Sequence, residues 1–164
     1  MRRLGKILMI AVLAMVSYTA SAELAPQWSR GTVLINANGG VLDPGASVSA
    51  DVVIVDQWWK GHFSVGGEMD LSVPGKDQVA FGITPRATYG LNITPKFEVH
   101  AAVGIGVGAW GYKDENLKDK TESFLMVNDL VGLRFFFTDH LALFAESGYS
   151  YRFSYYRLGL SLKF

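Results

Sequence analysis

The last ten residues, "YYRLGLSLKF" (residues 155–164), decide how the rest of the chain is interpreted. Side chains on a β-strand alternate between two faces, so apolar residues at every second position predict a strand with one apolar face. The apolar set is Tyr156, Leu158, Leu160, Leu162 and Phe164. Chain termini usually fray, so we expect a strand that reaches the last residue to be paired along its whole length.

The same period-two alternation recurs in seven earlier segments. They cover residues 29–38, 47–56, 62–73, 79–91, 97–108, 125–137 and 141–150. The breaks between them alternate between polar loops such as "KDENLKDKTE" and compact turns such as "NITPK". An even number of strands with this alternation of connections predicts an all-β protein, an eight-stranded antiparallel up-and-down barrel.

The second face of these segments decides whether the barrel is soluble or inserted in a membrane. A soluble, lipocalin-like barrel encloses its apolar face, and its other face must be charged and solvated. Here the other face is mostly Gly, Ala, Ser and Thr, and it includes Gly104, Gly106 and Gly108 in succession. Small side chains suit the narrow interior of an eight-stranded barrel. We therefore predict a transmembrane β-barrel whose apolar face points outward into lipid.

The first 22 residues are typical of a secretory signal peptide. Arg2, Arg3 and Lys6 precede the apolar run "ILMIAVLAMV", and "ASA" ends at residue 22 as a small-residue cleavage site. A retained anchor helix is the alternative, but the run is shorter than the ~20 apolar residues of a membrane helix. We predict a signal peptide over 1–22 and a single barrel domain over 23–164.

Charge and cysteine content exclude several classes of function. The chain has 15 basic and 15 acidic residues, and removing the three basic residues of the signal peptide leaves 12 and 15, a net charge of −3. A mildly acidic chain lacks the basic footprint of a nucleic-acid-binding protein. Because the chain has no cysteine, disulfides and thiol chemistry are excluded.

Charged residues are predicted on the small-residue, inward face. This face carries Asp51, Glu68, Arg86, Glu98, Arg134, Glu146 and Arg157. Asp70 and Arg30 are expected there too, with Lys163 at the periplasmic mouth. Burying lone charges is costly, and pairing lowers that cost. We expect Glu146 between Arg134 and Arg157, in a structural network that fills the lumen; the alternative is a narrow pore for small solutes or ions.

Aromatic residues are predicted to form two girdles at the membrane interfaces. The periplasmic set is Trp28, Trp58, Trp59, Tyr89, Phe97, Phe135, Phe137 and Phe164. The set at the opposite rim is Trp110, Tyr112, Phe124, Tyr149, Tyr151, Tyr155 and Tyr156.

The signal peptide, the eight segments, "VGLRFFFTDHLALFAESGYSY" (131–151) and the final "YYRLGLSLKF" resemble small Gram-negative outer-membrane β-barrels of the OmpA/OmpX type. The resemblance implies a multi-pass barrel in the outer membrane, exported through a cleaved signal peptide. It also implies that the last strand is read by the barrel-assembly machinery during biogenesis. The residues that match this assembly signal are Tyr156, Leu158, Leu160, Leu162 and Phe164.

An enzymatic function requires a nucleophile, a base and an orienting acid within hydrogen-bond reach. Some outer-membrane barrels modify lipid A, so a lipid-A hydrolase is the alternative of this class. The candidate bases are His62, His100 and His140, and all three are predicted away from the outer leaflet. The pair Glu98 and His100 is interpreted as packing, and the histidines lack the spacing of metal ligands.

We therefore predict a monomer without catalysis, cofactor or metal, in contact with outer-membrane lipid. Its expected role is structural or surface-interacting, through adhesion or partner binding. The longest and most charged loop is predicted at Lys113 to Glu122, and the strands beside it are expected to project from the membrane. An extracellular partner would bind these rim loops or an exposed sheet edge.

Overall fold

A computed structural model describes residues 28–41, 44–59, 61–75, 78–114, 117–150, 153 and 156–164. The predicted signal peptide, Tyr151 and Tyr155 lie outside these residues. The described chain forms eight strands: β1 (Val33–Gly40), β2 (Gly45–Trp58), β3 (Gly61–Gly75), β4 (Gln78–Thr94), β5 (Phe97–Asp114), β6 (Leu117–Phe136), β7 (Leu141–Ser150) and β8 (Tyr156–Lys163). Every strand pairs antiparallel with its neighbours, and β1 pairs with β8 to close the barrel. The predicted all-β, eight-stranded antiparallel barrel is confirmed.

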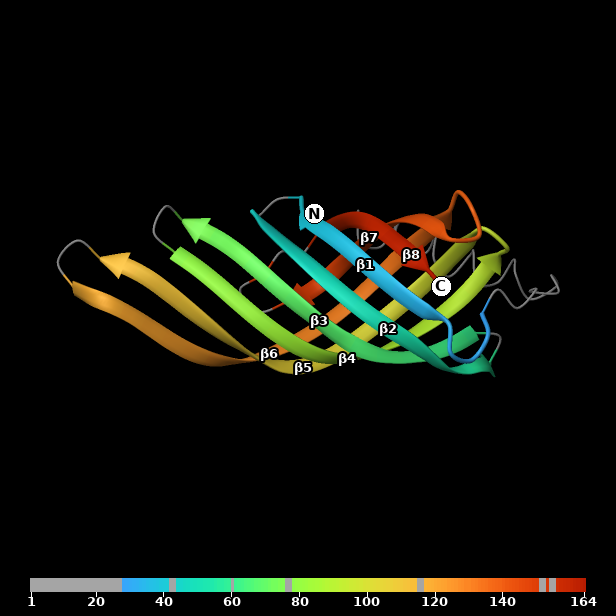
Figure 1. The fold of residues 1–164 in the computed structure, drawn as a ribbon, viewed down its shortest axis with the longest axis horizontal. Helices are drawn as coiled ribbons and strands as arrows, with labels where there is room; N and C mark the ends of the chain where they lie inside the picture. The colour runs from blue at the N-terminus through green and yellow to red at the C-terminus, as the bar shows by residue number, and fades with distance from the viewer. Residues whose placement is uncertain are drawn as a thin grey trace, which may run out of the picture.

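The barrel has two distinct ends. We call the end with the β2–β3, β4–β5 and β6–β7 connections and Phe164 the turn end, and the opposite end the loop end. Strands β3 to β6 have 15 to 20 residues, whereas β1, β7 and β8 have eight to ten. The hairpins β3–β4 and β5–β6 therefore extend well beyond the other strands, as Figure 1 shows.

The predicted loop at Lys113 to Glu122 is wrong. Strand pairing continues through Trp110↔Glu122 and Tyr112↔Lys120 as far as Asp114↔Leu117. The sequence "KDENLKDKTE" is charged but contains no Gly or Pro that would end a strand, so the hairpin extends through it. The strands on either side of this segment do extend beyond β1, β7 and β8, and their projection from a membrane stays a prediction.

Burial alternates along the strands in the predicted sense. Inward side chains are mostly polar, charged or small, and outward side chains are mostly Val, Ile, Leu and aromatic residues. The large apolar side chains that point inward include Leu34, Met126, Leu130, Phe136 and Phe144. On β5, Val103, Ile105 and Val107 are 60–66% exposed, and similar side chains cover the outer faces of the seven other strands. A continuous apolar surface of this size is far larger than a soluble monomer presents.

No helix within the described residues is long and apolar enough to cross a membrane.

Two glycines on the inner face make room for large inward side chains. A Cβ added at Gly90 would lie 2.2 Å from His62 Cε1, and one added at Gly132 would lie 2.4 Å from His100 Nε2. Both distances are shorter than any real contact, so a larger residue at either position would displace a histidine. The small-residue pattern of the inner face thus fits the narrow lumen of an eight-stranded barrel.

Apolar clusters close both ends of the lumen. At the turn end the cluster is Trp28, Leu34, Val53, Phe136 and Ala142, and at the loop end it is Ala80, Met126 and Phe153, with Phe124 packed against it. These clusters lie above and below the polar middle of the barrel.

Three predicted girdle residues, Trp28, Trp110 and Phe124, lie on the inward face instead; Trp110 is in register with the buried Ala80 on β4. Trp28 precedes β1, and the backbone turns at Gly31, whose φ of 90° favours glycine. This turn returns the Trp28 ring to the lumen, where it is buried. Phe124 shares the inward face with Met126, two residues later, so strand alternation places it inside. The remaining exposed large aromatics are Trp58, Trp59, Phe81, Phe135, Phe137, Tyr149, Tyr156 and Phe164.

Candidate functional site

The first group of buried charges in the lumen surrounds Arg86. Asp51, Glu68 and Arg86 project from the adjacent strands β2, β3 and β4. Arg86 Nε donates to Asp51 Oδ1 over 2.9 Å and Nη1 donates to Glu68 Oε2 over 2.7 Å, while Nη2 also pairs with Asp51. Charge-assisted bonds of this kind offset much of the cost of burying the ions.

A second arginine joins this group from the far side of the barrel. Arg157 Nη1 on β8 donates to Glu68 Oε1 over 2.7 Å, and Nη2 donates to Asp70 Oδ1 and Ser150 Oγ, each over 3.1 Å. Glu68 therefore binds two guanidinium groups, Arg86 on one carboxylate oxygen and Arg157 on the other.

A second group lies around Arg134 and His100. Arg134 Nη1 pairs with Glu98, and Arg134 Nε donates to Ser161 Oγ over 3.0 Å. His100 Nε2 lies 3.0 Å from Glu146 Oε1, and Nδ1 lies 3.5 Å from Glu98 Oε1. The imidazole thus sits between two carboxylates, and which nitrogen donates depends on the tautomer.

Asn36 on β1 connects the groups. Its Nδ2 donates to Ser49 Oγ over 3.0 Å and to Asp51 Oδ2 over 3.3 Å. Its Oδ1 accepts from Ser161 Oγ over 2.6 Å and from Arg134 Nη2 over 3.4 Å. Asn36 therefore joins the two groups into one connected network of ion pairs and hydrogen bonds.

The structure places all seven predicted interior residues inside the barrel, each at most 7% exposed. The expected partners of Glu146 are wrong: it contacts His100, whereas Arg134 contacts Glu98 and Arg157 contacts Glu68 and Asp70. Glu146 and Arg157 are register neighbours, but the long arginine side chain crosses the lumen to carboxylates on β3.

The sequence analysis misplaced Arg30 and missed four polar residues of the network. Arg30 is exposed in the turn before β1, because that segment is not yet a strand, so its predicted interior position is wrong. The network also includes Asn36, Ser49, Asn128 and Ser161, which the sequence analysis did not single out. Each is a polar residue at an inward position, and that alternation was the signal that could have identified it.

Negative charge exceeds positive charge in the described lumen. The five buried carboxylates are Asp51, Glu68, Asp70, Glu98 and Glu146, and three arginines oppose them. Asp70 Oδ2, Glu98 Oε2 and Glu146 Oε2 have no hydrogen-bond partner among the described residues. Within the same residues, no group of three or more His, Cys, Asp or Glu side chains is arranged to hold a metal ion.

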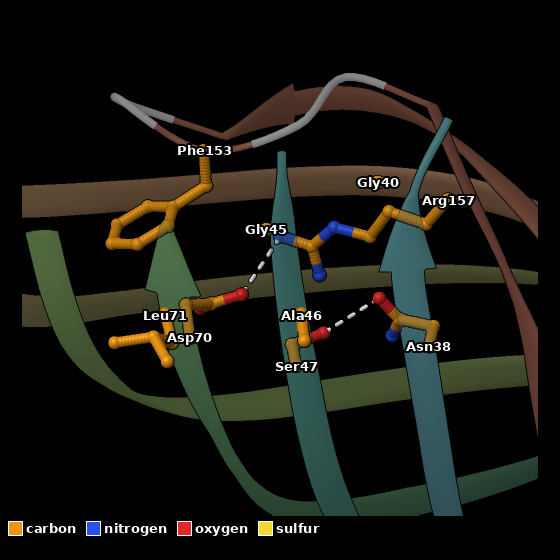
Figure 2. A pocket seen from close by; sticks show the side chains of 9 residues that line it. All are labelled: Asn38, Gly40, Gly45, Ala46, Ser47, Asp70, Leu71, Phe153 and Arg157. Carbon is orange, nitrogen blue, oxygen red and sulfur yellow. Dashed lines mark hydrogen bonds and ion pairs between the residues drawn. The ribbon is translucent and has the colours of Figure 1, made fainter. Parts of the chain in front are cut away.

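The loop end of the lumen contains a small pocket. Figure 2 shows Phe153 on one side of it, with the Arg157–Asp70 ion pair and the hydrogen bond from Ser47 to Asn38 around it. The lining residues are Asn38, Gly40, Gly45, Ala46, Ser47, Asp70, Leu71, Phe153 and Arg157. Phe153 is 5% exposed, so it covers the network from this side.

Trp28 closes the turn end of the lumen. Its ring centroid lies 4.3 Å from that of His62, and Nε1 donates to Asn92 Oδ1 over 3.0 Å. Lys163 Nζ lies 5.2 Å from the ring centroids of both Trp28 and Phe136, as a cation over two aromatic rings. The network is thus covered by an aromatic side chain at each end.

The C-terminal strand has the expected pairing. The backbone N–H of Phe164 donates to Val33 over 2.9 Å, and the N–H of Val33 donates back over 3.1 Å, so the strand is paired to its last residue. The residues of the predicted assembly signal all point outward and are 44–68% exposed: Tyr156, Leu158, Leu160, Leu162 and Phe164.

One edge of the projecting sheet has no strand beside it among the described residues. The β5–β6 pairing extends to Asp114↔Leu117, but the β6–β7 pairing begins only at Asn128↔Ser150. Among the residues that the structure describes, 117–127 of β6 are therefore paired on one side only. Such an edge presents backbone N–H and C=O groups that another strand can bind.

No family model and no curated protein matches the sequence. Solved structures share the fold. The N-terminal β-barrel domain of Pseudomonas aeruginosa OprF is 16% identical with a TM-score of 0.57, covering 84% of this chain and all of that one. Ail, the attachment invasion locus protein of Yersinia pestis, is 11% identical with a TM-score of 0.56, covering 83% of this chain and all of that one.

Neisserial surface protein A is a third similar structure. It is 15% identical with a TM-score of 0.51, covering 81% of this chain and 94% of that one. At these identities the likeness shows the fold: the chain has the architecture of the small eight-stranded outer-membrane β-barrels.

Proposed function

We propose that this chain is an integral outer-membrane β-barrel with a structural or surface-interaction role and without catalysis. One observation carries the proposal: an apolar exterior surrounds an interior filled by a connected ion-pair network. The apolar exterior is stable only in lipid, where closure of the barrel gives the backbone N–H and C=O groups inside the bilayer hydrogen-bond partners. The low-identity structural neighbours support the location because they are outer-membrane barrels.

The filled lumen favours a structural interior over a pore. Arg86 and Arg134 pair with carboxylates on nearby strands, and Arg157 crosses the lumen to carboxylates on β3. Trp28 and Phe153 cover the two ends. Eight strands leave a lumen only wide enough for side chains. A conducting path would require several buried ion pairs to separate together, which is strongly unfavourable.

The contacts of the histidines give little support to the hydrolase alternative. His100 lies between Glu98 and Glu146, and its side chain is fully buried. His62 is packed against Trp28 at the turn end, and His140 Nδ1 lies 2.9 Å from the backbone oxygen of Lys163. None of these contacts joins a histidine to a hydroxyl nucleophile.

Export and assembly are part of the same proposal. The predicted signal peptide over 1–22 would direct export through the inner membrane and be cleaved. The outward row that ends at Phe164 would then be recognised by the barrel-assembly machinery. Its exposure supports this role, because a recognition motif must be accessible before the barrel inserts.

The surface role is assigned to the projecting β5–β6 hairpin. The one-sided edge at residues 117–127 would accept an extended segment of an extracellular protein by strand addition. Ail has been crystallised in complex with the heparin analogue sucrose octasulfate, so one barrel of this fold binds a ligand. For this chain we propose a polypeptide partner, because the edge offers backbone groups.

Three measurements test the proposal, one on purified residues 23–164 and two on cells that express the full chain. In planar bilayers we expect no steady single-channel conductance, and a reproducible open channel would contradict the filled lumen. On intact cells, a photo-crosslinker placed at Ser123 should capture an extracellular protein, whereas one at Leu160 on the lipid face should not. Equal labelling at both positions, or a changed lipid A on mass spectrometry, would contradict the surface role.

A further inference from the structure

Asp129 is an unusual residue on the outward face. Strand alternation places it between Val127 and Val131, whose side chains point outward, while Asn128 and Leu130 are buried. Between the turn-end aromatics and the rim marked by Tyr149, every other outward residue of the described strands is uncharged. An ionisable group on a lipid-facing surface is costly and usually has a functional partner.

Asp129 lies close to the point where β7 ends and the longer strand β6 continues. It pairs in register with Tyr149, one residue before the end of β7, while β6 continues toward the hairpin paired with β5. The backbone N–H of Tyr149 donates to Asp129 Oδ1 over 3.3 Å. The carboxylate is therefore at the loop-end rim, where aromatic girdles and lipid headgroups meet.

Two tyrosines lie on the next two strands at this rim: Tyr149 on β7, directly opposite Asp129, and Tyr156 on β8. Tyr149 is 46% exposed and Tyr156, the first residue of β8, is 50% exposed. Tyr156 pairs with Ser147, two positions from Tyr149 on the same outward face, so the rings are diagonal neighbours. One carboxylate with two aromatic rings is a combination that attracts an organic cation through charge and cation–π contact.

We propose that Asp129, Tyr149 and Tyr156 bind the primary ammonium group of a lipid headgroup at the outer rim. This inference rests on the proposed membrane location, since only an inserted barrel brings these residues to headgroups. A divalent cation is a poorer fit because it requires about six or more oxygen ligands, and the described residues supply no cluster of acidic side chains here. A bound ammonium group also neutralises the single charge on this face.

Native mass spectrometry of the refolded chain tests the site with two probe lipids. Phosphatidylethanolamine carries the ammonium group, and phosphatidylglycerol does not. We expect Asp129→Asn, which preserves shape, to retain about tenfold less phosphatidylethanolamine than the unchanged chain. Tyr149→Leu should lower retention, whereas Tyr149→Phe should keep it. Asp139→Asn, an exposed change at the turn end, is the matched control.

The outcomes separate this site from the fold itself. A heat-dependent shift in gel mobility first verifies that each variant is a folded barrel, and failure of the unchanged chain to fold in lipid would reject the membrane proposal. If Asp129→Asn folds and retains phosphatidylethanolamine normally, the ammonium site is rejected. Equal losses of both lipids, or loss on adding EDTA, would reject it too, because the carboxylate would then act without the ammonium group.

Discussion

Arg157 on β8 crosses the lumen to Glu68 on β3, where Nη1 and Oε1 lie 2.7 Å apart. The same carboxylate also binds Arg86, so one residue compensates two buried cations. Strands that are not neighbours in the sheet are thereby joined through the interior. The barrel is held together by its backbone ladder around the wall and by these side chains through the centre.

Replacing Glu68 with alanine should strongly destabilise the barrel. Both guanidinium groups would lose a charged partner in a site that water does not reach, and breaking a buried pair costs about 3–5 kcal/mol. The measurement is the free energy of unfolding in urea, with the chain folded in lipid vesicles. Glu122→Ala, an exposed change on the projecting part of β6, should stay within about 0.5 kcal/mol of the unchanged chain. Similar losses in both variants would mean that the network contributes little.

Trp28→Ala tests the closure of the turn end. The ring is 3% exposed and packs on His62 and Phe136, so its removal should cost about 3–5 kcal/mol. The matched variant is Trp59→Ala, because Trp59 is 86% exposed and should change the free energy of unfolding far less. If the two variants unfold alike, Trp28 is not packed inside the barrel in lipid.

Gly132→Ala should disturb the His100–Glu146 contact. The new methyl group would lie 2.4 Å from His100 Nε2 and would force the ring away, which we expect to cost about 1–3 kcal/mol. Gly111→Ala is the control, since nothing lies within 4 Å of its added Cβ. Urea unfolding of the two variants gives the comparison, and an unchanged stability for Gly132→Ala would show that the lumen has spare room.

The assembly role of Phe164 separates biogenesis from stability. Phe164→Ala should reduce the amount of folded barrel in the outer membrane of cells, while the purified variant should refold in vesicles with nearly unchanged yield. The phenylalanine side chain is 68% exposed, so its loss removes little packing. Phe137→Ala, another exposed aromatic at the same end, should leave assembly in cells intact. Equal defects for both would assign the effect to the aromatic girdle rather than to a terminal signal.

The sequence predicts the strands of this barrel better than the contacts between the side chains inside it. Alternation alone identifies all eight strands and places Asp51, Glu98 and Arg134 inside, because a two-residue period leaves only two directions for each side chain. Arg134 contacts Glu98, its register partner on the adjacent strand, but Arg157 reaches across several strands to Glu68, and adjacency along the sheet could not reveal that contact. The predicted partners of Glu146 were wrong for this reason.

The ends of the barrel were also harder to predict. Trp28 lies before the first strand, where no alternation exists, and its inward position depends on the turn at Gly31. The charged segment around Lys118 was interpreted as a loop because charge usually marks solvent, yet charged residues are compatible with a strand that projects into water.

The central claim is that the apolar face of the strands contacts lipid and the polar face encloses the lumen. The chain contains no cysteine, so a nitroxide attached at Ile105→Cys reports on one outward position of β5. In vesicles, the label should collide readily with lipid-soluble oxygen and only weakly with a water-soluble nickel reagent. Dominant collision with the nickel reagent, together with a folded soluble monomer in the absence of detergent, would contradict the account.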